Sequence, residues 1–192
     1  MMLFQNDHIS EEAFFNFLEG RKWLLDGVTI CGGEPTLQAD LFEFAEKIKK
    51  MWFLVKLDTN GRDYEIVEKL IQHKLVDYVA IDLKHVPAFY EKAVGVPQTN
   101  DFFTEYRKIL ALLRTGVVEY EYRTTVVKGM HTIVDIEKMA EYVQGVDHYY
   151  LQNYVWWNSL NPDFGGESFS DDELLAFQSV ASRYVKHCGL RK

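Results

Sequence analysis

The chain has 192 residues, 47% of them hydrophobic, which is enough apolar material for the core of one domain over residues 1–192. The net charge of −8 argues against a nucleic-acid-binding surface, and no apolar run approaches the length of a membrane span. The two cysteines, Cys31 and Cys188, are too few for a disulfide framework and are typical of a reducing compartment. We therefore expect a single cytoplasmic domain without nucleic-acid or membrane partners.

Strand-like and helix-like patterns alternate along the chain. A first helix is expected after Ser10, which can cap it. In chain order, strands are predicted at 27–31, 53–58, 77–83, 117–127 and 148–155, and further helices at 37–51, 64–73, 100–114, from Thr132 and from Ser170. The stretches 87–97 and 156–169 are expected to be irregular. Five strands, each followed by a helix, predict an α/β fold in which a parallel sheet with right-handed crossovers curls into a partial barrel.

The most informative stretch is Gly32-Gly33-Glu34-Pro35, which follows the first predicted strand directly. The glycines let another molecule approach the backbone where a side chain would block it. Pro35 fixes φ and removes a donor where a helix begins. Glu34 is left as an acceptor at the carboxyl end of a strand, where α/β proteins bind ligands. Taken alone, the stretch is more typical of a tight turn, so its interpretation depends on the other strand ends.

Polar side chains also stand at the ends of the other predicted strands. They are Asp58, Thr59 and Asn60 on the second strand, Asp82 and Lys84 on the third, Arg123 on the fourth, and Gln152 and Asn153 on the fifth. Each alone has an ordinary explanation as a turn, a surface ion pair or an edge residue. The ends of parallel strands share one rim, however, so we expect these groups to converge on one cavity. Acids for an amine or cation, with Lys84 and Arg123 for a carboxylate, suit a zwitterionic amino-acid ligand.

Four motifs together resemble those of radical S-adenosylmethionine (SAM) enzymes. They are Gly32-Gly33-Glu34-Pro35, Asp58-Thr59-Asn60-Gly61, Asp82-Leu83-Lys84 and Arg123-Thr124-Thr125-Val126-Val127. The chain is most similar to the proteins that activate glycyl-radical enzymes, above all the one for anaerobic ribonucleoside-triphosphate reductase. The likeness is strongest over 27–84 and weaker to Val155 and the C-terminal helix. The family fold is a partial (β/α)₆ barrel, of which we find five strands.

The resemblance implies a function and a set of SAM-binding residues. In the family, an electron donor reduces a [4Fe-4S] cluster. The reduced cluster cleaves SAM to a 5′-deoxyadenosyl radical, which takes a hydrogen atom from a glycine of the partner enzyme. Gly32, Gly33 and Glu34 would hold the SAM amino group, and Pro35 would shape the turn. Asp58, Thr59 and Asp82 match positions that surround a monovalent cation near the SAM carboxylate in pyruvate formate-lyase-type activating enzymes. Lys84 and Arg123 would bind SAM or tune charge, and none of these residues is a catalytic group.

One part of the family pattern is missing. The family binds its cluster through C-x-x-x-C-x-x-C in the loop after its first strand, and Cys31 and Cys188 cannot supply it. Met1 falls where the family's sequence leaves that loop. We therefore expect the first strand and the cluster loop to be absent, as in a truncated chain or one with a misplaced start codon, and this chain alone to be inactive. The open barrel edge beside 27–31 predicts self-association or N-terminal residues folded over the gap.

Two other functions fit the same residues. A cluster-free, non-catalytic domain that binds SAM or another protein would explain the missing cysteines. A Schiff-base aldolase-like barrel would use Lys84 as its nucleophile, although Asp82 beside it favours the charged amine, which is the wrong form for attack.

Overall fold

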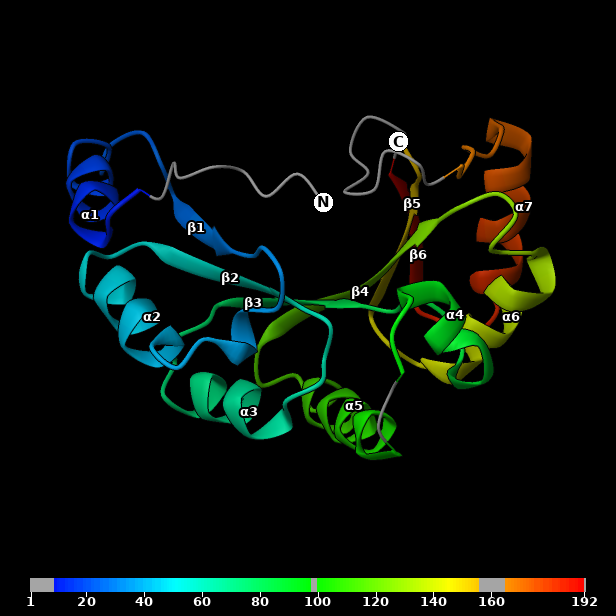
Figure 1. Cartoon of the computed structure of the whole chain (residues 1–192), viewed down its shortest axis with the longest axis horizontal. Coiled ribbons are helices and arrows are strands. Elements are labelled where there is room, and N and C mark those ends of the chain that lie inside the picture. The colour runs from blue at the N-terminus through cyan, green and yellow to red at the C-terminus, as the bar shows by residue number, and fades with distance from the viewer. Residues whose placement is uncertain (1–8, 98–99, 156–164, 192) are drawn as a thin grey trace.

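The computed structural model describes residues 9–97, 100–155 and 165–191. Its sheet has six strands, all parallel, and their order across the sheet is the order along the chain. The strands are β1 (Gly27–Ile30), β2 (Leu54–Thr59), β3 (Tyr78–Asp82), β4 (Glu119–Val126), β5 (His148–Asn153) and β6 (His187–Arg191). Figure 1 shows that the sheet curves strongly, so the predicted α/β partial barrel is confirmed.

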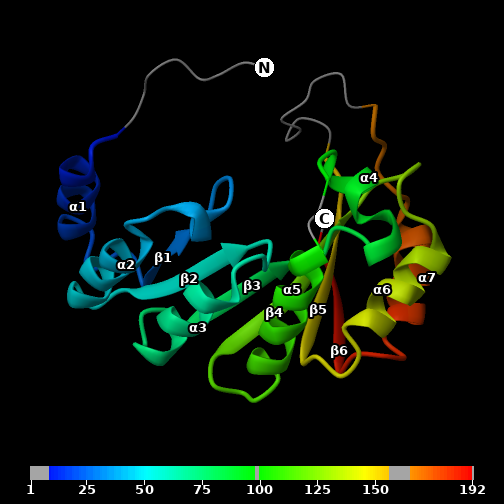
Figure 2. The same ribbon diagram turned by 60° about the horizontal axis from the view of Figure 1, so that its bottom comes forward.

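The helices connect successive strands, apart from the first, which precedes β1, and most of them lie along the outer, convex side of the sheet (Figures 1 and 2). They are α1 (Glu11–Glu19), α2 (Leu41–Lys50), α3 (Tyr64–Gln72), α4 (Tyr90–Val94), α5 (Asn100–Leu113), α6 (Ile133–Tyr142) and α7 (Asp171–Ala181). The predicted caps are present, because the side chains of Ser10, Thr132 and Ser170 each accept a hydrogen bond from the first turn of their helix. Within the described part of the chain, every helix is too short or too polar to span a lipid bilayer.

Three expectations about the elements were wrong. The sheet has a sixth strand, β6, where the sequence analysis ended with a helix. The segment 37–51 is not one helix, because Pro35–Leu37 forms a short 3₁₀ turn and Gln38 is extended, so α2 begins only at Leu41. The stretch 87–97 contains the short helix α4, which ends at Gly95 in the left-handed conformation. The expected irregular stretch 156–169 lies partly outside the described residues.

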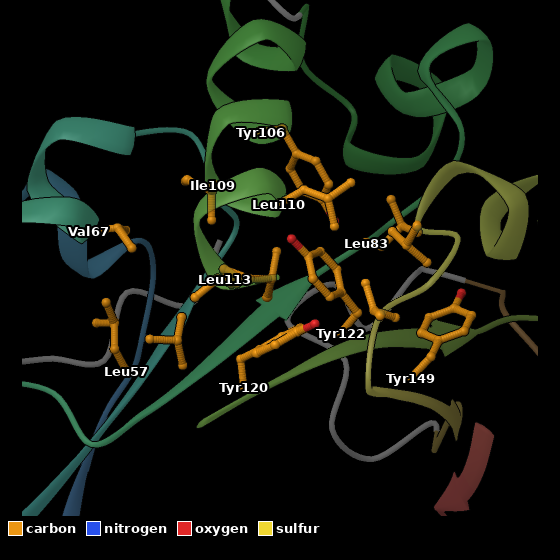
Figure 3. Packing of buried hydrophobic residues seen from close by; sticks show 14 of the residues in the cluster. Leu57, Val67, Leu83, Tyr106, Ile109, Leu110, Leu113, Tyr120, Tyr122 and Tyr149 are labelled. Carbon is orange, nitrogen blue, oxygen red and sulfur yellow. The ribbon is translucent and has the colours of Figure 1, made fainter. Parts of the chain in front are cut away.

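The hydrophobic core lies between the convex face of the sheet and the helices. Figure 3 shows Tyr120 and Tyr122 of β4 packed beneath Ile109 and Leu113 of α5. These four side chains are at most 3% exposed. Side chains alternate between the two faces of a strand, so the residues between them point to the concave face. On that face the strands carry polar and charged groups, and this is the inner surface of the partial barrel.

β1 is an end strand of the sheet, since its only partner among the described strands is β2. A strand edge without a partner is prone to pair with another chain. The expected self-association through this edge therefore stays a prediction. The alternative, N-terminal residues folded over the edge, concerns residues 1–8, which lie outside the described part of the chain.

Candidate functional site

A cavity of about 300 Å³ opens at the carboxyl ends of β1 to β4. Its polar wall is formed by Cys31, Gly32, Gly33, Asp58, Thr59, Asn60, Arg62, Asp82, Lys84 and Arg123. Its apolar wall comes from α4 and α5 and includes Tyr90, Val94 and Phe102. The prediction that polar residues from separate strand ends converge is thus confirmed for Asp58, Asp82, Lys84 and Arg123, which come from three neighbouring strands.

The double glycine after β1 has the backbone conformation that the sequence suggested. Gly32 and Gly33 have φ angles of +93° and +57°, which side-chain-bearing residues rarely adopt. A Cβ atom built on either residue would have no heavy atom within 4 Å, so this backbone borders open space. The turn therefore exposes its main chain to whatever occupies the cavity.

Glu34 has a different environment from the one that the sequence suggested. Its side chain does not line the cavity, and the residue is only 9% exposed. Oε1 accepts hydrogen bonds from the Thr36 backbone N–H at 3.1 Å, from the Thr36 hydroxyl at 2.8 Å and from the Thr59 hydroxyl at 2.6 Å. Oε2 accepts from the Asn60 N–H at 2.7 Å. In this structure the carboxylate therefore ties the turn after β1 to the end of β2.

A cluster of five charged residues crosses the concave face beside this turn. Arg123 donates from Nε to Asp82 Oδ1 at 2.6 Å and from Nη1 to Asp58 Oδ2 at 2.8 Å. The Lys84 ammonium lies 2.7 Å from Asp82 Oδ2, and the Lys56 ammonium lies 2.7 Å from Asp58 Oδ1. Asp58 Oδ1 is buried and receives no hydrogen bond, so the Lys56 contact is an ion pair without hydrogen-bonding angles. We call these five residues the charge cluster.

The strand register explains why the charge cluster forms. Asp82 of β3 and Arg123 of β4 are direct register partners, and Lys56 stands two residues before Asp58 on β2. Alternate residues share a face, so Lys56 and Asp58 both lie on the concave side. Sequence reasoning missed Lys56, although its spacing from Asp58 was a usable signal.

Two members of the charge cluster, Asp82 and Arg123, are held in their ionised forms. Burial would raise the pKa of Asp82, but the positive charges of Lys84 and Arg123 and their hydrogen bonds outweigh it and keep that pKa below the ordinary value. Burial likewise acts to lower the pKa of Arg123, and its bonds to Asp82 and Asp58 outweigh this and raise the pKa. The carboxylates of Asp58 and Asp82 therefore both have cationic partners within the protein itself.

The backbone that carries Lys84 is fixed by β4 and the segment after it. The Thr124 hydroxyl donates to the Leu83 carbonyl at 2.6 Å. The ring of His131, a residue that the sequence analysis did not single out, contacts the Lys84 carbonyl through Nε2 at 2.9 Å and accepts from the Val127 N–H through Nδ1. Burial lowers the pKa of His131, which favours the neutral ring that this bonding requires.

The polar residues of β5 do not line the cavity. Asn153 forms two hydrogen bonds with the backbone of Phe169, so it fixes the segment before α7. Gln152 pairs in register with Arg191 of β6. Arg191 in turn forms a two-bond ion pair with Glu121 of β4, at 2.8 and 2.6 Å, which the sequence analysis also missed.

The residues present do not fit an iron–sulfur cluster. Cys31 is exposed at the end of β1 and Cys188 is buried on β6. Within residues 9–97, 100–155 and 165–191, no three His, Cys, Asp or Glu side chains are grouped so that they could hold a metal ion. Because a cluster needs several thiolates in one place, the described part of the chain does not supply the ligands for one.

The sequence that folds into this parallel partial barrel matches a known family. The model of the radical SAM superfamily matches residues 7–143, and the chain belongs to that superfamily. It is 34% identical over 169 residues to a Methanocaldococcus jannaschii protein named as a candidate glycyl-radical enzyme activating enzyme, covering 86% of this chain and 70% of that protein. A second candidate activating enzyme of that organism is 26% identical, over 92% of this chain and 68% of its own length.

A solved structure shows the same fold. A domain of a pyruvate-formate lyase-activating enzyme from Bacteroides vulgatus superimposes with a TM-score of 0.67, covering 86% of this chain and 99% of that one at 18% identity. The expected resemblance to radical SAM activating proteins is confirmed.

Proposed function

We propose that the cavity binds SAM and that the chain is the barrel of a radical SAM enzyme that activates a glycyl-radical enzyme. The observation that carries the proposal is that two different kinds of group border one cavity. The first is the exposed Gly32–Gly33 backbone, held from behind by Glu34, a buried carboxylate whose four donors are all uncharged. The second is the part of the charge cluster that lines the cavity, in which Lys84 and Arg123 stand beside Asp58 and Asp82.

These two kinds of group match the amino-acid end of SAM. The open backbone of the turn lets an ammonium group approach main-chain carbonyl oxygens, which are acceptors, and Glu34 fixes that turn and adds negative charge behind it. Lys84 and Arg123 offer positive charge and N–H donors to the carboxylate, while Asp82 and Asp58 hold the Arg123 guanidinium in place. The apolar wall of Tyr90, Val94 and Phe102 would exclude water from the rest of the ligand.

Binding of SAM is tested by ligand-observed NMR, which detects weak complexes, with SAM, methionine and adenosine as separate probes. We expect SAM to bind and Arg123→Met to weaken binding by about tenfold or more, since charge-assisted hydrogen bonds contribute about 1.5–3 kcal/mol each. The matched control is Lys128→Met, which removes an exposed ion pair with Glu173 elsewhere on the molecule. If the wild type and Arg123→Met bind SAM equally well, the ligand is not held by the charge cluster.

The partner that we propose is a glycyl-radical enzyme, with anaerobic ribonucleoside-triphosphate reductase first on the strength of the sequence resemblance. Its support is the similarity to proteins named as candidate activating enzymes of this class. Co-purification of the chain with that reductase, compared with pyruvate formate-lyase, tests the choice. If the chain forms a complex only with pyruvate formate-lyase, that enzyme is the partner and the ribonucleotide reductase is not.

The non-catalytic alternative is supported by the two separated cysteines. Both this alternative and the proposed function predict that this chain, after anaerobic reconstitution with iron and sulfide, gives no stoichiometric [4Fe-4S] absorption or EPR signal. A stoichiometric cluster would show that our account of the thiolates is wrong. The aldolase-like alternative is weakened, because the Lys84 ammonium pairs with Asp82 at 2.7 Å, which stabilises the charged amine. Trapping with borohydride and small carbonyl compounds tests it directly.

A further inference from the structure

The oxygens expected to hold a monovalent cation already have partners. The family resemblance predicts such a cation among Asp58, Thr59 and Asp82, and protein oxygen atoms are what hold an ion of this kind. Both carboxylate oxygens of Asp58 and of Asp82 have a cationic nitrogen within 2.8 Å. The Thr59 hydroxyl donates its proton to Glu34 and accepts from the Gly61 N–H with one of its two lone pairs.

The electrostatics of the cluster also disfavour an added cation. Lys56, Lys84 and Arg123 bring three positive charges to the carboxylates of Asp58, Asp82 and Glu34, the last of which accepts from Thr59, so the site has no surplus of negative charge. Asp58 Oδ1 receives no hydrogen bond, but the Lys56 ammonium lies 2.7 Å from it. A metal ion at this oxygen would therefore lie against a fixed positive charge. The described residues therefore do not fit a bound Na⁺ or K⁺.

We propose that the Lys56 ammonium is the resident cation of this site, in the place where the family resemblance predicts a metal ion. Lys56 projects from the middle of β2, on the same face as Asp58, and its ammonium also lies 5.9 Å from the ring centre of Tyr78. The side chain is 31% exposed, so it is anchored within the concave face rather than free in solvent. Binding of an anionic group in the cavity then needs no added monovalent cation.

The test measures the thermal unfolding midpoint of the full chain in KCl, NaCl and tetramethylammonium chloride at equal ionic strength. Lys56→Met removes the ammonium and keeps an unbranched side chain, and Lys56→Arg keeps the charge. Lys49→Met is the matched control, because it removes an ion pair of equal length, with Asp77, outside the charge cluster. The proposal rests on the proposed function only for the identity of the ligand, and this measurement needs no ligand.

We expect wild type, Lys56→Arg and Lys49→Met each to unfold at one temperature in all three salts. Lys56→Met should unfold about 2–4 °C higher in KCl or NaCl than in tetramethylammonium chloride, because a metal ion then binds the folded state at Asp58. A wild type that is itself stabilised by K⁺ or Na⁺, or a Lys56→Met variant indifferent to the salt, overturns the proposal. If Lys56→Met does not fold, ²⁰⁵Tl NMR of the wild type decides: saturable Tl⁺ binding refutes the proposal and its absence supports it.

A parallel SAM titration in the same salts separates the two proposals. SAM affinity of the wild type that does not change with the salt supports a resident Lys56, and affinity that rises with K⁺ or Na⁺ refutes it. A wild type that binds no SAM in any salt refutes the proposed function, and the unfolding measurement still decides the role of Lys56.

Discussion

Replacing Glu34 removes the carboxylate that ties the turn after β1 to the end of β2. In Glu34→Ala the backbone N–H groups of Thr36 and Asn60 lose their acceptor, and the hydroxyls of Thr36 and Thr59 must rotate to other partners. An unsatisfied buried N–H costs about 1–3 kcal/mol, and the hydroxyls recover part of their loss by rotating. We therefore expect the free energy of unfolding to fall by about 2–4 kcal/mol. Glu34→Gln keeps one of the two oxygens and should cost about 1–2 kcal/mol.

Equilibrium unfolding in urea, followed by circular dichroism, measures both losses, provided that the dependence on urea concentration stays unchanged. The matched control is Glu46→Ala, which removes an exposed ion pair with Lys50 one turn away on α2 and should cost about 0.5 kcal/mol or less. If Glu34→Ala costs no more than this control, the carboxylate does not hold the turn, and its part in shaping the cavity has to be abandoned.

Three further predictions concern other parts of the sheet. Hydrogen bonds from Arg191 and Tyr78 outweigh burial and lower the pKa of Glu121, so the stability that this group contributes is present above its ordinary value of 4.5 and is lost as the pH falls through the lower folded value. Arg191→Met should therefore lower the free energy of unfolding by about 2 kcal/mol at pH 7 and by progressively less below pH 4.5. Unfolding in urea across that pH range measures the loss, and a loss independent of pH would contradict the assigned ion pair with Glu121. Gly189→Ala would place a Cβ 2.5 Å from the Tyr150 ring, and Arg191 Cζ lies 3.8 Å from the centre of the same ring. The substitution should therefore lower the free energy of unfolding by about 1–3 kcal/mol. If this contact is the cause, the loss disappears in a Tyr150→Ala background. The open edge of β1 predicts that the chain self-associates in sedimentation velocity, and a monomer at every concentration whose β1 amides exchange without protection would refute this.

Local patterns in the sequence determined most of the fold. Helix caps act within four residues, so Ser10, Thr132 and Ser170 could be assigned without tertiary information, and all three are present. The alternation of strands and helices was equally sufficient for the parallel, curled sheet. β6 was missed because it is short, contains a glycine and lacks a regular apolar pattern, and it forms through its ladder with β5.

The candidate site also has features that the sequence determined and features that only the tertiary structure decided. The sequence by itself determined which strand ends are polar and that the two glycines need an unusual backbone, because both properties belong to single residues and their neighbours. Only the tertiary structure decided the partners. Glu34 is bonded to Thr59, 25 residues later, and Arg123 joins Asp58 across 65 residues. The sequence pattern gives the face on which a residue lies but not the register between strands. That register makes Asp82 and Arg123 direct partners, so the cluster as a whole emerged only when the sheet was assembled.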